Sequence, residues 1–282
     1  MPRRPYFELI EPTVEEVPVV VEVPHAGVDV PPELAAALVA PVRALARDAD
    51  LLVDELYADA PSLGATFLAS RISRYVVDLN RAEDDVDAAV VAGDPRPARA
   101  HARGLVWRTT TDDEPALERP LTREQYRARV ETIWRPYHDA LRALLDRKIA
   151  RFGYVVLLCA HSMPSIGRDG HADEGIVRAD VVPGSRGRTS AHASVIDAVD
   201  WVARTRGLRV EHDRPYRGGY STTRYGRPAL RCHAIQIELA RRLYLDEAAL
   251  VRDAAGFQKT RELCREFVAK LAALSPARLR GG

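Results

Sequence analysis

Cysteine is scarce in this chain, which has only three cysteines in 282 residues. Cys159, Cys232 and Cys264 are odd in number and none is spaced as CxxC, so we expect neither a disulfide framework nor a cysteine zinc site. Cys159 stands inside an apolar run, which favours a small core residue over a nucleophile.

An excess of charge is also absent. The 41 Lys and Arg residues balance 40 Asp and Glu residues, giving a net charge of +1. This balance gives no argument for a nucleic-acid or membrane partner, and we expect neither. No apolar run approaches the roughly 20 residues of a membrane span, and the basic N-terminus lacks the apolar segment of a signal peptide. We therefore expect a cytoplasmic protein, as a monomer or small homo-oligomer.

Several catalytic signatures are missing too. Ser162 follows His161 but lies in no GxSxG elbow, and there is no phosphate loop or dinucleotide fingerprint. What is present is a chain that is 46% hydrophobic and alternates apolar strand-like runs with helical stripes. This pattern predicts one α/β domain with some antiparallel strands. Residues 83–120 form a polar excursion from it, and residues 275–282 are expected to be a disordered tail.

Three elements bear on the later argument. A mixed apolar stripe predicts a helix from Leu45 to about Ala60. The run from Tyr75 to Leu79 predicts a buried strand. Thr122 and Gln125 form a capping box for a long helix that ends at Gly153 and should be kinked by Pro136.

Two histidines follow apolar strands in the same way. The run from Val155 to Leu158 leads to His161, and the run from Val19 to Val23 leads to His25. The carboxyl ends of parallel strands are where open α/β folds bind their ligands, so the two histidines could meet there. A metal site would need a third ligand. Asp48, Asp50, Asp54 and Glu55 are the nearest carboxylates, although a solvated acidic helix face explains most of such a cluster.

Other polar residues also follow strands. Glu238 ends an apolar run, where it could act as a general base or simply pair with Arg241 or Arg242. Asn80 and Arg81 follow the run that ends at Leu79. An arginine there suits a substrate carboxylate, but a salt bridge to Glu83 or Asp84 is the alternative. The glycines of Arg217-Gly218-Gly219 could let backbone N–H groups approach a ligand, although a turn alone would explain them.

Six segments of the chain form a recognisable set: Val23–Gly27, Arg74–Arg81, His161–Ser162, Gly218–Tyr220, Tyr225–Pro228 and His233–Leu239. Together they resemble the N-formylglutamate amidohydrolase family, over about residues 17–250 and in the family's order. The family is related to the zinc carboxypeptidases and aspartoacylases. The resemblance implies one such domain over residues 1–282, with a mixed, mostly parallel sheet flanked by helices and one catalytic zinc ion.

The resemblance also implies roles for individual residues. His25, His161 and an aspartate, for which we choose Asp50 over Asp48 or Asp54, would be the zinc ligands. Glu238 would be the general base. Substrate binding would fall to Asn80, Arg81, Arg217, Gly218 and Gly219.

Two positions depart from the family pattern. Ala26 stands where the family often has serine, and Cys159 stands where it often has an aspartate that would orient a metal ligand. The expected activity is zinc-dependent hydrolysis of an N-acylated acidic amino acid, above all N-formyl-L-glutamate. The alternatives are another small-acyl amidohydrolase, a carboxypeptidase-like peptidase using the same site, and a non-catalytic carboxylate-binding relative. Two histidines and a carboxylate would also accept divalent metals other than zinc.

Overall fold

The structure is a computed structural model that describes residues 6–35, 37–94, 102–170 and 172–279. Its contacts divide the chain into two compact units. Unit 1 comprises Met1–Glu8, Pro24–Leu51 and Ala69–Arg142. Unit 2 comprises Leu9–Val23, Leu52–Leu68 and Ala143–Gly282. The expectation of one domain over the whole chain stays a prediction.

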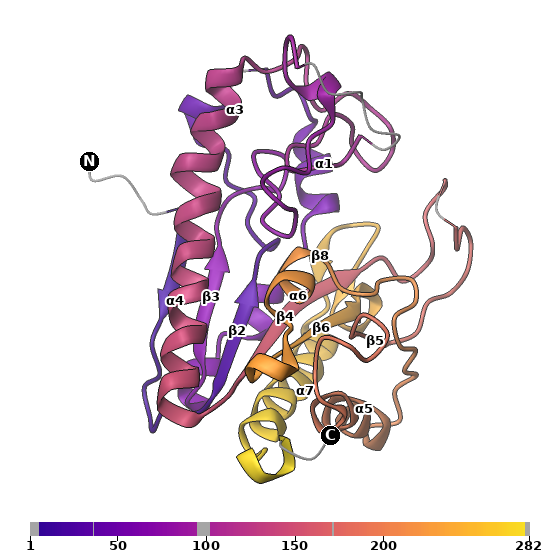
Figure 1. Cartoon of the computed structure of the whole chain (residues 1–282). Helices are drawn as coiled ribbons and strands as arrows, with labels where there is room; N and C mark the ends of the chain where they lie inside the picture. The colour runs from indigo at the N-terminus through magenta and orange to yellow at the C-terminus, as the bar shows by residue number, and fades with distance from the viewer. Residues whose placement is uncertain (1–5, 36, 95–101, 171, 280–282) are drawn as a thin grey trace. The chain divides into compact units, whose positions relative to one another are not determined.

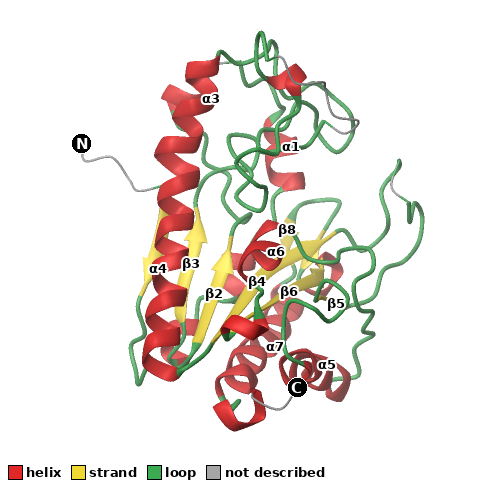
Figure 2. Cartoon of the chain, in the orientation of Figure 1, coloured by secondary structure: helices red, strands yellow, loops and turns green. Residues whose placement is uncertain are grey.

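A six-stranded sheet runs in the order β1-β3-β2-β4-β6-β5 (Figure 2). Its strands β2, β4 and β6 pair in parallel, and β5 pairs with β6 in the antiparallel sense. The α/β class and the mixed sheet flanked by helices are thereby confirmed. The strands are β1 (Phe7–Ile10), β2 (Val19–Val23), β3 (Thr66–Ser70), β4 (Val155–Met163), β5 (Val181–Gly184) and β6 (Cys232–Ala240).

The strands at the centre of the sheet are buried on both faces. Every residue of β2, β4 and β6 is buried, as expected for apolar, β-branched runs in a parallel sheet. In unit 2, α7 (Ala254–Ala272) packs on β2, and α5 (Ala193–Thr205) packs on β5 and α7. The short helix α6 (Tyr220–Tyr225) packs on β4 and β6. Residues 217–222, which include its first turn, lie over the face of the sheet that bears His161.

Unit 1 holds the first helices and the whole of the polar excursion. Its elements include a 3-10 turn η1 (Pro32–Leu34), the helix α1 (Val42–Asp48) and a second 3-10 turn, η3 (Ala88–Val90). Described residues of the excursion pack together, since Val86, Val90, Val106 and Leu117 share one apolar cluster. Residues 95–101 of the excursion lie outside the described residues.

The long helix begins as predicted, and a π-helical segment interrupts it just before Pro136, where we expected a kink. Thr122 and Gln125 form the capping box of α3 (Arg123–Arg129). A π-helical segment, η4 (Val130–Trp134), then leads into α4 (Arg135–Phe152), which spans the boundary of the two units. Pro136 lacks an N–H group and cannot continue the regular hydrogen-bond ladder, so the ladder shifts just before it.

Two of our predictions for residues 45–79 are wrong. The helix from Leu45 to Ala60 is broken into α1 and α2 (Val53–Leu56), because Leu52 adopts a left-handed conformation with φ of 66°. Asp50 therefore lies between helices instead of on a helix face. The run from Tyr75 to Leu79 forms turns instead of a strand, because the N–H group of Val76 bonds back to the carbonyl of Ser73 at 2.9 Å.

The C-terminal elements also differ from expectation. Residues 276–279 of the expected disordered tail form a 3-10 turn, η7 (Pro276–Leu279), and residues 280–282 lie outside the described residues. A small hairpin pairs β7 (Leu245–Asp246) with β8 (Val251–Arg252) before α7. Three further 3-10 turns are η2 (Ala60–Leu63), η5 (Pro228–Leu230) and η6 (Arg241–Leu243). None of the described helices is long and apolar enough to cross a membrane.

Candidate active site

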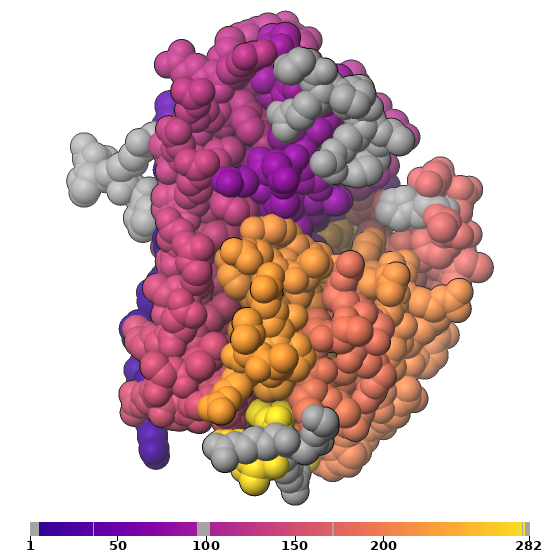
Figure 3. All heavy atoms as spheres, viewed as in Figure 1, coloured from indigo at the N-terminus to yellow at the C-terminus, as the bar shows by residue number. Residues whose placement is uncertain are grey.

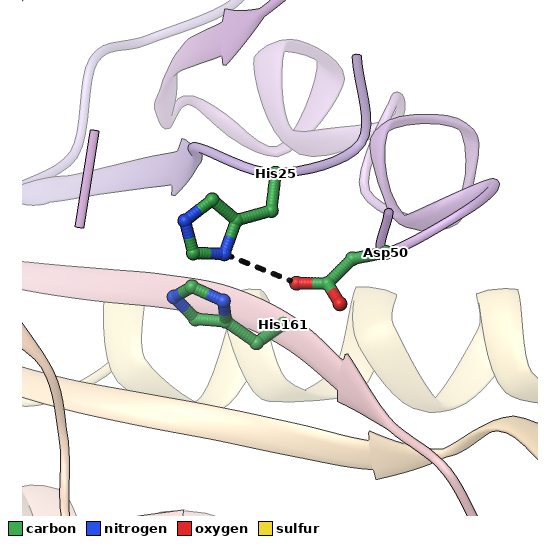
Figure 4. Close-up of side chains that lie close together, drawn as sticks. All are labelled: His25, Asp50 and His161. Atoms are coloured by element: carbon green, nitrogen blue, oxygen red, sulfur yellow. Dashed lines mark ion pairs between the residues drawn. The ribbon is translucent and has the colours of Figure 1, made fainter. Parts of the chain in front are cut away.

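His25 lies two residues beyond β2 and is held by a fully buried carboxylate. Its Nε2 atom is 2.7 Å from Oδ1 of Asp78, and the two side chains are 3% and 0% exposed. Asp78 also accepts hydrogen bonds from Arg74, at 2.8 and 3.2 Å, and from Nε1 of Trp107 at 3.1 Å. Because Asp78 engages Nε2, the Nδ1 atom of His25 is left to face Asp50, at 3.6 Å from Oδ2 (Figure 4).

The charges around Asp78 and His25 support one another. Burial alone would raise the pKa of Asp78, but Arg74 and His25 outweigh it and hold that pKa well below its usual value. Burial and Arg74 would lower the pKa of His25, but the carboxylates of Asp78 and Asp50 outweigh them, and the pKa is raised. The lowered pKa favours the ionised form of Asp78, whose carboxylate orients the imidazole ring.

Asp48 and Asp50 have different environments although they are two residues apart. The Asp48 carboxylate accepts hydrogen bonds from the Tyr75 hydroxyl and from both the N–H group and the hydroxyl of Thr111. Asp48 thus joins the end of α1 to the polar excursion. The backbone N–H group of Asp50 instead donates to the carbonyl of His25 at 2.9 Å, which turns the Asp50 side chain toward the imidazole.

His161 lies within β4, because that strand extends to Met163 and does not end before the histidine as expected. Its partner in the register of the parallel pair is Glu238 of β6, so the two side chains lie next to each other on one face. Nε2 of Gln236 donates to Oε1 of Glu238 at 2.8 Å. Arg242, one of the two arginines considered as partners of Glu238, bonds Asp180 at 2.6 Å. Arg241, the other, donates one hydrogen bond to the Ser162 hydroxyl at 3.3 Å, and its pairing with Glu238 stays an alternative.

His25, Asp50 and His161 form a group that could hold a metal ion. All three side chains are buried, and one ligand atom from each lies within 4.8 Å of the others (Figure 4). Two imidazoles and one carboxylate are a donor set found in catalytic zinc sites. The Asp78 carboxylate on the far nitrogen of His25 is also the contact that ligating histidines usually make. The residues present therefore fit a divalent metal.

Asn80 and Arg81 lie close to the same support. The N–H group of Asn80 donates to Oδ1 of Asp78 at 2.9 Å, the oxygen that also contacts His25. Nη1 of Arg81 lies 3.5 Å from Oδ2 of Asp85, and its side chain is 37% exposed. The salt bridge considered as the alternative for Arg81 therefore exists, although its partner is Asp85 and not Glu83 or Asp84. The role of Arg81 in binding a substrate carboxylate stays a prediction.

Within residues 217–219, the backbone at Gly218 requires a glycine and packs closely against β5. Gly218 has a φ of 102°, which favours glycine. A Cβ atom on Gly184 of β5 would lie only 2.8 Å from the nitrogen of Gly218. The N–H group of Arg186 donates to the carbonyl of Arg217 at 2.9 Å. Figure 3 shows this part of unit 2, with residues after about 210 in orange beside the coral residues near 190.

Sequence reasoning missed three residues of the site. Asp78 contacts His25, Arg74 contacts Asp78, and Gln236 contacts Glu238. All three stand within segments that carry the family resemblance, but we assigned none of them a role. The available signal was a charged or amide side chain within an apolar run, which is costly unless it is bonded. At Cys159, burial and the nearby Glu22 raise the pKa of the thiol, so this residue is an inert part of the core.

Comparison with known proteins supports the family resemblance. A family profile described as N-formylglutamate amidohydrolase matches residues 17–245. An N-formylglutamate deformylase of Pseudomonas putida is 34% identical over 234 residues, which are 82% of each chain. A protein of the same description from Pseudomonas aeruginosa is 34% identical over 91% of this chain and 93% of its own. The crystal structure of N-formylglutamate amidohydrolase from Ralstonia eutropha JMP134 superposes with a TM-score of 0.85 at 31% identity, covering 94% of this chain and 96% of that one.

Proposed function

Because the chain belongs to the N-formylglutamate amidohydrolase family, we propose that it hydrolyses N-formyl-L-glutamate to formate and L-glutamate. The observation that carries this proposal is the placement of a carboxylate, Glu238, beside His161 of the buried His25–Asp50–His161 group. A carboxylate next to a metal site is the arrangement that metal-assisted amide hydrolysis requires.

His25, Asp50 and His161 would hold the metal, with Nδ1 as the ligand atom of His25. Zinc is our choice, because two imidazoles and a carboxylate suit it, although other divalent metals could bind the same set. When bound, zinc activates water for attack and polarises the carbonyl group of the amide. Asp78 supports this role by keeping its hydrogen bond to Nε2 of His25, which leaves Nδ1 available.

Glu238 would move the proton in the reaction. Its carboxylate takes a proton from the attacking water, whose oxygen forms a bond to the formyl carbon. The same proton is then given to the glutamate nitrogen as the C–N bond breaks, so formate and the free amine leave together. The exposed guanidinium of Arg81, beside Asn80, would bind a substrate carboxylate and orient the amide. Arg217, Gly218 and Gly219 would line the pocket.

The proposal extends to the setting of the reaction. Release of glutamate and formate from N-formyl-L-glutamate belongs to histidine degradation, and we propose that the chain acts there. We also propose that it acts in the cytoplasm on a free small molecule, without nucleic acid or a membrane, as a monomer or small homo-oligomer.

The test is formate release from N-formyl-L-glutamate by metal-free protein, with and without added zinc. We expect release only with zinc, and a loss of about 10²- to 10⁴-fold in kcat for Glu238→Gln, the range for removing a general base. Glu211→Gln, an exposed change in the same unit, is the matched control and should retain activity. Zinc-independent release, or an active Glu238→Gln variant, would contradict the mechanism. Equally fast cleavage of a tripeptide would contradict the substrate.

A further inference from the structure

Four neighbouring strands of unit 2 place one residue each in a single row beneath the proposed site. The strand register aligns Glu22 of β2 with Cys159 of β4, and Cys159 with Gln236 of β6. It also aligns Gln236 with Gly184 of β5. Residues aligned in this way point to the same face of a sheet. His161 and Glu238 lie two positions further along β4 and β6, so they share that face.

Residues 217–222 contact every member of this row. Each contact joins one residue of this segment to one strand, so the segment is seated across the sheet. The Ser221 hydroxyl donates to Oε1 of Glu22 at 2.8 Å, and the Thr222 hydroxyl lies 3.8 Å from Sγ of Cys159. The N–H group of Gly219 donates to Oε1 of Gln236 at 2.9 Å, and the backbone of Gly218 lies close to Gly184.

Gln236 is the member of the row that reaches Glu238. The backbone N–H group of Gly219 can only donate, so the atom of Gln236 that it meets must be the amide oxygen. The amide nitrogen therefore faces Glu238 and donates to its Oε1 atom at 2.8 Å. Both side chains are buried, with exposures of 3% and 5%, and a hydrogen bond to a charged acceptor is about twice as strong as a neutral one.

We propose that Gln236 is a positioning residue that holds the Glu238 carboxylate in its reactive orientation and ties it to the Gly218–Gly219 backbone. This inference rests on the proposed function, because Glu238 is the general base only in that reaction. A side chain fixed at both ends holds its neighbour more narrowly than packing alone does. The backbone that would line the substrate pocket and the carboxylate that would move the proton are therefore joined through one amide group.

Two substitutions separate the two ends of Gln236. Gln236→Glu keeps the size of the side chain and the acceptor for Gly219, but it cannot donate to Glu238 while it is ionised. Gln236→Met removes both hydrogen bonds. Thr222→Val is the matched control, because it changes a different contact between residues 217–222 and the row, the one to Cys159.

For both Gln236 variants we expect kcat for N-formyl-L-glutamate to fall at least about tenfold while KM changes less than about threefold, the pattern for a lost transition-state contact. Bound zinc should remain equimolar with the chain, and Thr222→Val should keep kcat within about twofold. If Gln236→Glu is as active as the wild-type chain, Gln236 only anchors Gly219 and the proposal is wrong. It is also wrong if kcat falls only in proportion to lost zinc.

The proposal can be separated from the proposed function. If the wild-type chain releases no formate from N-formyl-L-glutamate, the substrate assignment fails. The crystal structure of zinc-loaded Gln236→Glu then decides the positioning role without any substrate. A Glu238 carboxylate displaced from its wild-type rotamer supports it, and an unchanged rotamer overturns it.

Discussion

At the scale of single residues, the contrast between Asp48 and Asp50 allows the third metal ligand to be tested. Asp48 is 4% exposed, and its carboxylate is bonded by Tyr75 and Thr111. Asp50 is 3% exposed and faces Nδ1 of His25. The same chemical change at the two positions should therefore have opposite consequences.

We predict that Asp50→Asn abolishes tight zinc binding with little change in the free energy of unfolding of the metal-free chain. Asp48→Asn should retain zinc but lower the free energy of unfolding by about 1–3 kcal/mol, because its amide group would meet a buried donor. Metal titration against a chelator and denaturant unfolding of the metal-free variants measure the two effects. Loss of zinc in Asp48→Asn alone would show that the assignment of the third ligand is reversed.

The same residues show what a sequence can reveal about this site. His25 and His161 could be predicted because each stands at or near the end of an apolar run, and sheet geometry brings such ends together. Asp78 could not be predicted as the partner of His25, because 53 residues separate them and the turn of residues 75–79 reads as a strand. Choosing Asp50 over Asp48 likewise depended on the family resemblance, since their spacing alone did not distinguish them.

At the scale of elements, α4 carries a lysine that is buried beside the start of β2. The Lys148 side chain is 0% exposed. Its Nζ atom donates to the carbonyl of Val17 at 2.7 Å and lies 2.9 Å from Oε1 of Glu16. Burial lowers the pKa of Lys148, although Glu16 partly opposes this shift. The lysine therefore bonds a backbone carbonyl and pairs with a carboxylate just before β2 begins.

Lys148→Met should lower the free energy of unfolding by about 1–3 kcal/mol, because the Val17 carbonyl and Oε1 of Glu16 lose a buried charged donor. The Val17 carbonyl keeps the N–H group of Val19 at 2.8 Å, and Glu16 keeps Arg151. Arg142→Met is the control on the same helix. Arg142 is 53% exposed and pairs with Asp139 on the surface, so its replacement should cost less than about 1 kcal/mol. Denaturant unfolding measures both, and equal losses would contradict a special role for the buried lysine.

Elements differed in how well local pattern predicted them. The capping box at Thr122 and the buried strands β2, β4 and β6 were confirmed, because caps and apolar runs are set by nearby residues. The break after α1 was not foreseen, because residues 45–60 keep a helical stripe that tertiary contacts override. There the N–H group of Asp50 bonds the carbonyl of His25, which is distant in sequence. The element that places a proposed ligand was thus the one where local preference and tertiary structure disagreed.

At the scale of the whole molecule, the near balance of 41 basic and 40 acidic residues leaves little net charge to oppose folding at neutral pH. One buried histidine should still make stability depend on pH. Nδ1 of His233, near the start of β6, accepts a hydrogen bond from the N–H group of His192 at 3.2 Å. Burial and the nearby His192 lower the pKa of His233 to about 4.

The sign of this pH effect follows from the acceptor role of His233. Its pKa of about 4 in the folded chain lies below its ordinary value of 6.5, so protonation favours the unfolded chain. The stabilisation is complete above about pH 6.5 and is lost as the pH falls toward about 4. Between pH 7 and pH 5, the protonation linked to His233 should lower the free energy of unfolding by about 2 kcal/mol. In His233→Asn, an amide oxygen can accept the same hydrogen bond without titrating. The variant should therefore lose about 2 kcal/mol less of its free energy of unfolding between pH 7 and pH 5 than the wild type does. Denaturant unfolding of the metal-free wild type and variant at both pH values measures the difference, and parallel losses would exclude His233 as the cause.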